Sequence, residues 1–315
     1  MSKSLSLRAV LSLTFILTAG LVLAQSQEPV IRRSAPQPRS PAPVLPQAPK
    51  APFQLNPQEQ QRMNQLLAVW ERESDKVKLF RCQFTRWDYD FTFGPKKNGF
   101  LMSERHGEIV YRAPDNGTFK ENDMRSFDSA TGKYTESTAG LEHWVCDGKA
   151  IYQFQPKTKT LEITELPPEM RGKAITDGPL PFLFGAKAET LRQRYWIRET
   201  TPQAEVGRQV WLEAWPKHAQ QAANFQRVEV ILGEKDFLPT GMQVYTPNGK
   251  DRTAYLFEER KINDKIGDIL NGYFLPPRTP LGWKKVVNPI SPPSAQTPPA
   301  AALKQAARPK SGAVR

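Results

Sequence analysis

Apolar and polar residues alternate along much of this chain, which is the pattern of half-buried β-strands. In the stretch LFRCQFTRWDYDFTF, apolar residues occupy even positions from Phe80 to Phe84 and odd positions from Trp87 to Phe93. The change of phase near residue 85 predicts a β-bulge or a sharp bend in one long strand. Because bulges are how a sheet curls, this stretch favours a strongly curved sheet.

Further strand-like segments follow along the chain as far as RTAYLFEERKI, which ends at Ile262. The dipeptides Asp147-Gly148 and Asn248-Gly249 are two-residue hairpin signals, and Pro156-Lys157 marks a further tight turn. Together these segments and turns indicate about ten antiparallel strands in a meander, so we predict a mainly β (α+β) fold with a large curved sheet. The further segments are GEIVYRAP, GTFKENDMRSF, EHWVCDGKAIYQFQPKTKTLEI, RYWIRET, RQVWLEAW, FQRVEVIL, LPTGMQVYTPNGK and RTAYLFEERKI.

Helical spacing is found at two places. Asn56 and Pro57 start the first helix, Glu59 closes a capping box, and the helix is expected to end near Asp75. The segment 166–192 has helix formers at both ends and prolines between, which predicts one or two short helices that interrupt the meander. The apolar stripe of the first helix is Met63, Leu66, Leu67 and Trp70.

The sequence DGPLPFLFG at 177–185 places large apolar residues inside this interruption. A connection that leaves a curved sheet and returns must cross its open face or its rim, so we expect these residues to cover the apolar face of the sheet. They are either a plug of ordinary core or a movable lid over a ligand cavity. The candidate lid residues are Leu180, Phe182, Leu183 and Phe184, and the candidate cavity residues are Trp87, Tyr89, Phe91, Trp144, Tyr152, Phe154 and Trp196.

The two ends of the chain differ in composition from the strand-rich part. Residues 1–24 have a basic start, an apolar stretch and a small-residue cleavage site at Ala24, which predicts a secretory signal peptide. Residues 25–52 and 288–315 are proline-rich and are expected to be disordered. These three segments carry most of the formal net charge of +12, so the domain predicted over 53–287 is nearly neutral and is not expected to bind nucleic acid.

Signatures of catalysis are scarce. No nucleophile elbow, phosphate loop, zinc-protease motif or dinucleotide fingerprint occurs, and Asp88 and Asp90 are expected on a solvated outer face. Cys82 and Cys146 are either a disulfide or two buried thiols. His143 and Cys146 face opposite sides of a strand, which disfavours a zinc site. We therefore expect no enzyme, no metal and no cofactor.

The order of the motifs is similar to that of the LolA-like carriers of lipoproteins. RHGEIVYRAPDNGTFK resembles one conserved block of that family, WVCDGKAIYQFQPKTKTL its hairpin, DGPLPFLFG its lid region, and YLFEERKIND with FLPPRTPLGWKKV its closing segment. EHWVCDGK and GPLPFLFG look closest to an uncharacterised exported planctomycete family. The resemblance implies an eleven-stranded half-barrel with helices as a lid over a cavity for acyl chains. It also implies lid control at Lys120, where the family has arginine.

Two functions follow as expectations. The first is a soluble exported carrier or chaperone, periplasmic or in the cell envelope, that binds lipid or the acyl chains of lipoproteins. The second is an envelope module that binds protein partners, with a half-barrel filled by its own side chains. Peripheral contact with a membrane is compatible with both.

Overall fold

The structure is a computed structural model of the chain and describes residues 49–92, 94, 99–138, 140–172, 182–183, 187–264 and 272–288. The predicted signal peptide over 1–24, most of the predicted linker and the predicted tail beyond residue 288 lie outside these ranges. So do Leu180 and Phe184. None of the helices in the described ranges is long and apolar enough to cross a lipid bilayer.

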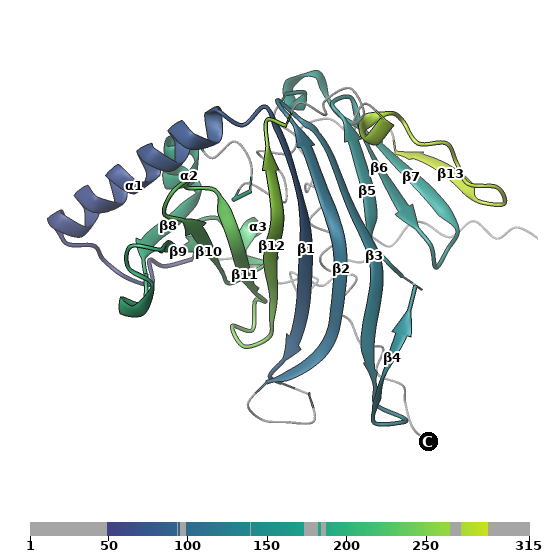
Figure 1. The fold of residues 1–315 in the computed structure, drawn as a ribbon, viewed down its shortest axis with the longest axis horizontal. Coiled ribbons are helices and arrows are strands. Elements are labelled where there is room, and N and C mark those ends of the chain that lie inside the picture. Colours follow the sequence, from purple (N-terminus) through teal and green to yellow (C-terminus); the bar gives the residue numbers. More distant parts are fainter. Residues whose placement is uncertain are drawn as a thin grey trace, which may run out of the picture. The chain divides into compact units, whose positions relative to one another are not determined.

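One large curved sheet makes up most of the fold (Figure 1). Its strand order is β13-β7-β6-β5-β3-β2-β1-β12-β11-β10-β9-β8, with β4 paired to β3 beside this path. The end strands β13 and β8 do not pair with each other, so the described strands form an open half-barrel. The strands are β1 (Leu79–Asp90), β2 (Phe100–Arg112), β3 (Asn116–Asp128), β4 (Lys133–Ser137), β5 (His143–Asp147), β6 (Ala150–Gln155), β7 (Thr160–Glu165), β8 (Tyr195–Glu199), β9 (Gln209–Pro216), β10 (Arg227–Gly233), β11 (Pro239–Tyr245), β12 (Arg252–Ile262) and β13 (Lys284–Asn288).

The predicted first helix is confirmed as α1 (Pro57–Asp75). The Asn56 side chain accepts a hydrogen bond from the Glu59 backbone N–H, and the Glu59 carboxylate accepts one from the Asn56 N–H, which completes the expected capping box. The predicted interruption contains the short helices η1 (Pro168–Met170) and α2 (Ala188–Arg194). Further short helices are η2 (Gln203–Glu205) and α3 (Ala219–Ala222).

The predicted hairpins are also present. Asp147 accepts hydrogen bonds from the backbone N–H groups of Lys149 and Ala150, and Gly148 adopts a positive φ of 82° in the turn between β5 and β6. Asn248 accepts backbone hydrogen bonds in the same way in the turn between β11 and β12. These side-chain contacts fix the loops and therefore the register of the strands that they join.

Two details of the sheet differ from the prediction. It has thirteen described strands where the sequence indicated ten or eleven. The last strand, β13, runs parallel to β7, with Lys284 opposite Thr160, so the sheet is not wholly antiparallel. More than a hundred residues separate the end of β7 from the start of β13, and a parallel pair requires such a long connection because a tight hairpin joins only antiparallel strands.

The predicted bulge does not lie at residue 85 itself; the nearest shifts of register lie on either side of it, between Arg81 and Gln83 in the pairing with β12 and between Asp88 and Tyr89 in the pairing with β2. Strand β1 pairs without interruption from Gln83 to Asp88 with both β2 and β12. The even-numbered side chains of β1 therefore all lie on one face. On that face the apolar residues end at Phe84, and the charged residues Arg86 and Asp88 follow. The change of phase marks the end of an apolar zone, and Asp88 lies on this covered face rather than on a solvated one.

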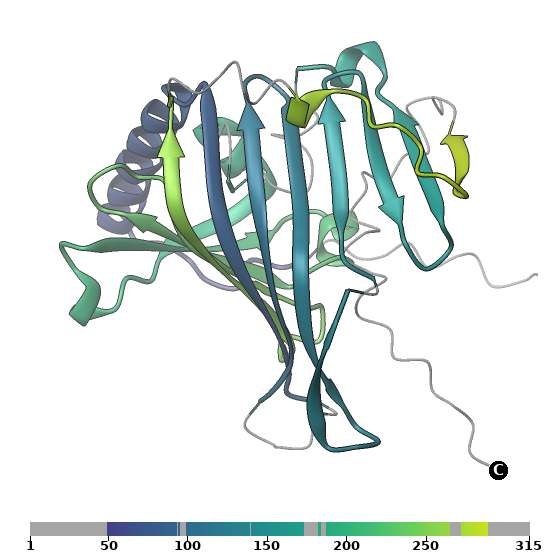
Figure 2. The ribbon, with the colours of Figure 1, turned by 45° about the vertical axis from the view of Figure 1, so that its right-hand side comes forward.

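Helix α1, helix α2 and the segment Phe182–Leu183 pack on one face of the sheet, which we call the inner face. In Figure 2, α1 lies beside and partly behind β12, and α2 lies behind β1 and β2. The main hydrophobic cluster joins these covers to inner-face residues of strands β1 to β3 and β8 to β12. The opposite, outer face has two smaller clusters beneath the segment 272–288, one around Val110 and Phe274 and one around Leu161 and Ile163.

Candidate functional site

A row of aromatic rings crosses the apolar zone of the inner face. Phe84 on β1 stacks on Phe119 on β3 with ring centroids 4.7 Å apart, and Phe119 stacks on Trp144 on β5 at 6.0 Å. Strand β2 lies between β1 and β3, and it offers Gly107 opposite Phe84. A Cβ at Gly107 would lie 2.5 Å from the Phe84 ring, so the glycine is what lets the ring cross β2.

The cover over this zone comes from three separate segments. Trp70 of α1 is 1% exposed, and Phe182 and Leu183 are 4% and 8% exposed in the same cluster. The Phe182 ring packs on Tyr195 at the start of β8, with centroids 4.9 Å apart. Phe182 and Leu183 belong to neither a helix nor a strand, so apolar contacts are what place them on the sheet.

Polar contacts at the surface hold the two covering helices together. The Lys187 Nζ lies 2.7 Å from Asp75 Oδ1, and the Ala188 backbone N–H donates to Glu71 Oε2. Both contacts join the first turn of α2 to the last turns of α1. The exposed ion pair contributes little stability, so the buried apolar side chains of the helices, including Leu191, dominate the packing.

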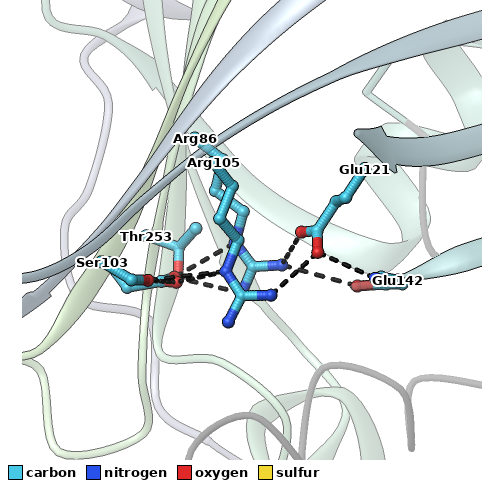
Figure 3. Close-up of polar contacts among 7 residues, drawn as sticks. Arg86, Ser103, Arg105, Glu121, Glu142 and Thr253 are labelled. Carbon is cyan, nitrogen blue, oxygen red and sulfur yellow. Dashed lines mark hydrogen bonds and ion pairs between the residues drawn. The ribbon is translucent and has the colours of Figure 1, made fainter. Parts of the chain in front are cut away.

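The charged zone of the inner face lies next to the aromatic row. Arg86 on β1 is 3% exposed and contacts Asp88, Glu121 and Glu142 at 3.1, 3.2 and 3.4 Å. Arg105 on β2 contacts the other Glu121 oxygen at 2.8 Å. We call these five residues the charged cluster. Figure 3 shows the two guanidinium groups between Glu121 and Glu142 on one side and Ser103 and Thr253 on the other.

The local fold creates this cluster at the point where β3 changes partners. Residues 116–120 of β3 pair with β5, and residues 124–128 pair with β4. Between them, the Glu121 backbone N–H donates to the Glu142 carbonyl, and the Glu142 N–H donates back to the Glu121 carboxylate. Both carboxylates therefore point to the same spot, where Arg86 neutralises them.

The cluster holds three carboxylates and two guanidinium groups, and this imbalance separates their pKa values. Burial raises the pKa of Asp88, but the Arg86 charge and hydrogen bonds from Ser103 and Thr253 more than offset it and hold the pKa below its usual value. Burial raises the pKa of Glu142, and the Arg86 charge does not fully offset it. The cluster is thus a largely buried group of charges that nearly compensate one another.

The structure distributes the predicted cavity residues over both faces of the sheet. Trp144 lies on the inner face with Phe119, and Phe182 and Leu183 cover that face. Trp87 comes directly after an inner-face residue of β1, and Trp196 comes directly before an inner-face residue of β8. Because successive side chains of a strand alternate between faces, both tryptophans lie on the outer face. The Arg252 guanidinium lies 5.2 Å from the rings of both Tyr89 and Phe91, and Tyr152 and Phe154 belong to an outer cluster.

Lys120 also lies on the outer face. It follows the inner-face residue Phe119, is exposed, and pairs in register with Glu108 and His143. It therefore does not face Phe182. Arg86 and Arg105 are inner-face cations that the sequence prediction missed. The signal that could have found Arg86 is its even-numbered position, which puts it on the same face of β1 as Phe80, Cys82 and Phe84.

Cys82 and Cys146 are free, buried thiols in the structure. They lie on β1 and β5, and the strands β2 and β3 separate them. Three neighbour spacings of about 4.8 Å put them roughly 14 Å apart, which is too far for a disulfide. In the described part of the chain, no three His, Cys, Asp or Glu side chains are arranged so that they could hold one metal ion.

No protein-family model and no curated protein matches the chain. Among solved structures, an uncharacterized conserved protein from Thermus thermophilus is 11% identical, with a TM-score of 0.37 over 72% of this chain and 99% of its own. MucB in the Pseudomonas aeruginosa MucA/MucB complex is 14% identical, with a TM-score of 0.33 over 64% of this chain and 58% of its own.

A LolA superfamily protein from Nitrosomonas europaea is 11% identical to this chain, with a TM-score of 0.28 over 66% of this chain and 96% of its own. The open curved sheet with helices over its inner face is the half-barrel architecture that the sequence resemblance implied. The similarity to a planctomycete family stays a prediction. Because every TM-score is below 0.5, the function is inferred below from this chain's own contacts.

Proposed function

We propose that the protein is an exported, non-enzymatic carrier that shelters an acyl chain between the inner face of the half-barrel and its cover. The observation that carries this proposal is the burial of Phe182 and Leu183 in the sheet's main hydrophobic cluster, although they belong to no regular element. A cover of this kind can be displaced by an apolar chain that replaces its contacts at little net cost.

The inner face has the two surfaces that an acylated ligand requires. The aromatic row around Phe84 and Phe119 offers apolar contacts for the hydrocarbon. The charged cluster beside it offers hydrogen-bonding groups where a polar head would emerge. Both surfaces lie on the same strands, β1 to β3, so one elongated molecule can contact both.

The test is to purify residues 25–315 without detergent, extract them with organic solvent, and analyse the extract by mass spectrometry. Titration with a fluorescent sixteen-carbon fatty acid measures binding directly. We expect stoichiometric binding by the natural sequence, loss in Phe182→Asp, and no change in Val206→Asp, whose site is 60% exposed. Circular dichroism checks that the variants fold.

If Phe182→Asp does not fold, Phe182→Ala serves in its place. The alanine leaves a void at an apolar site, so we expect it to bind the fatty acid still, with a changed affinity. Absence of extractable lipid together with absence of fatty-acid binding by the natural sequence would refute the carrier.

A second candidate is an envelope module that binds protein partners and whose half-barrel is filled by its own side chains. The observation that favours it is the close packing of the inner face, where Leu67, Trp70 and Phe84 are each 1% exposed. This candidate predicts that the fatty acid neither binds nor raises the unfolding temperature, whereas a ligand of the native state must raise it.

A further inference from the structure

Exposed apolar side chains concentrate in one segment near the end of the described chain. Of the seven large apolar residues that are exposed in the described part, four lie between residues 275 and 287. We call residues 275–288 the C-terminal edge, because the segment ends in the edge strand β13 (Figure 1). These four residues are Leu275, Leu281, Val286 and Val287.

Leu281 is the extreme case. Its exposed fraction is 103%, and it stands in the turn that the Trp283 N–H closes by donating to the Pro280 carbonyl. The Trp283 ring lies half-buried and packs edge-on against Phe154 of β6 at 6.1 Å. The turn is thus anchored to the outer face of the sheet by the tryptophan, while the leucine points away from it.

The charge of the C-terminal edge has one sign. Its charged side chains are Arg278, Lys284 and Lys285, and it contains no acidic residue. Among the described residues, none of these three cations forms an ion pair. Exposed apolar side chains are unfavourable in water, and cations beside a fully exposed leucine and two partly exposed valines are the combination by which proteins bind the interface of an anionic membrane.

A groove of about 740 Å³ opens beside this edge on the outer face. Arg278 and Lys285 line it from the edge, and Lys149 and Arg171 line it from the sheet side. Asp147 and Glu165 also line it. Asp147 already accepts hydrogen bonds from two backbone N–H groups and the Tyr152 hydroxyl. The groove therefore keeps a positive balance and has room for phosphate head groups.

We propose that the C-terminal edge is a docking surface for a membrane of anionic phospholipids. Leu281 enters the acyl boundary, Trp283 lies at the level of the head groups, and the four cations of the groove contact the phosphates. This surface is on the opposite face of the sheet from the acyl-chain site, and it adds membrane attachment to the proposed function without depending on it.

The test is co-sedimentation of residues 25–315 with extruded vesicles of pure phosphatidylcholine or of phosphatidylcholine with an equal share of phosphatidylglycerol. We expect binding to the anionic vesicles only, weakened by added salt. Leu281→Ser should weaken it on the order of tenfold, and Arg278→Gln and Lys285→Gln, which each remove one cation of the groove, about fivefold each. Val206→Ser, at another exposed apolar site, should bind like the natural sequence.

Four outcomes overturn the proposal. The first is a lack of binding to anionic vesicles, and the second is equal binding to both kinds of vesicle. The third is full binding by Leu281→Ser with loss in a variant whose tail cations Lys304, Arg308, Lys310 and Arg315 are changed to glutamine. The fourth is a dimer in analytical ultracentrifugation that Leu281→Ser abolishes while vesicle binding is unaffected, because the edge would then contact a second copy.

Discussion

His143 is a half-buried base whose surroundings keep it uncharged. Its ring stacks on Phe154 at 4.3 Å with the planes nearly parallel, and the exposed Lys120 is its register partner on β3. Burial, and then the Lys120 charge, lower the pKa of His143 from 6.5 to about 4. The sequence indicated only that His143 and Cys146 face opposite sides of β5, and that placement holds in the structure.

The lowered pKa of His143 predicts a pH dependence of stability. Below pH 6.5 the unfolded chain binds a proton at His143 that the folded chain refuses down to about pH 4, so folding stability is lost as the pH falls through this window. We expect about 1–2 kcal/mol of this loss between pH 7 and pH 5. Urea unfolding at both pH values measures it.

The matched variant is His143→Gln, which cannot titrate. It is expected to be less stable at pH 7, because it loses the stacking on Phe154, but its loss between pH 7 and pH 5 should be smaller by the His143 contribution. The raised pKa of Glu142 means that the folded chain binds a proton there more readily than the unfolded chain, so Glu142 adds stability as the pH falls. Glu142 is present in both proteins, and its contribution therefore cancels in the comparison. Identical slopes would contradict the assignment to His143.

At the scale of the elements, strand β2 depends on a residue without a side chain. An added Cβ at Gly107 would lie 2.3 Å from the Lys120 carbonyl oxygen and 2.5 Å from the Phe84 ring. The pairing of β2 with β3 also shifts register between His106 and Gly107. The ring of Phe84 and the backbone of β3 therefore occupy the space that any other residue would need.

We predict that Gly107→Ala destabilises the protein by about 2–3 kcal/mol through overpacking and disturbs the stacking of Phe84 on Phe119. Urea unfolding and near-ultraviolet circular dichroism measure the two effects. Gly272→Ala is the matched control, because nothing lies within 4 Å of its added Cβ and its φ is not positive. Equal stability of the two variants would show that β2 can move away from Phe84.

Elements with strong local signals could be predicted from the sequence, whereas the faces of the strands could not. The capping box of α1 and the Asp147-Gly148 turn depend on neighbouring residues, so their sequence determines them directly. The inner or outer position of Trp87 depends on register across several strands. Because apolar residues were assumed to mark the inner face, Arg86 was missed and Trp87 was assigned to the wrong face.

The edge of the sheet was beyond prediction for a similar reason. Strand β13 contains only five residues and is held by a parallel pairing with β7, more than a hundred residues earlier in the chain. No local pattern distinguishes it from the end of a loop. Its exposed valines and lysines became informative only when the sheet showed that they form a free edge.

At the scale of the whole molecule, one hydrophobic cluster joins α1, the inner face and the cover. It contains Cys82 on β1 and Cys146 on β5, and both thiols are 1% exposed or less. Burial raises the pKa of each thiol to about 12, so neither forms the reactive thiolate in the folded state at neutral pH. Each thiol can react only when the part of the cluster around it opens.

Alkylation of the two thiols therefore reports whether the half-barrel opens as one unit. We expect iodoacetamide at pH 8 to modify Cys82 and Cys146 at equal rates, each slowed roughly a thousandfold or more relative to the urea-unfolded chain, because a shared cluster opens cooperatively. Phe182→Ala, which weakens the cover, should speed both reactions by the same factor. Mass spectrometry of the modified peptides gives both rates, and faster modification of Cys146 alone would mean that β5 opens while β1 and α1 stay folded.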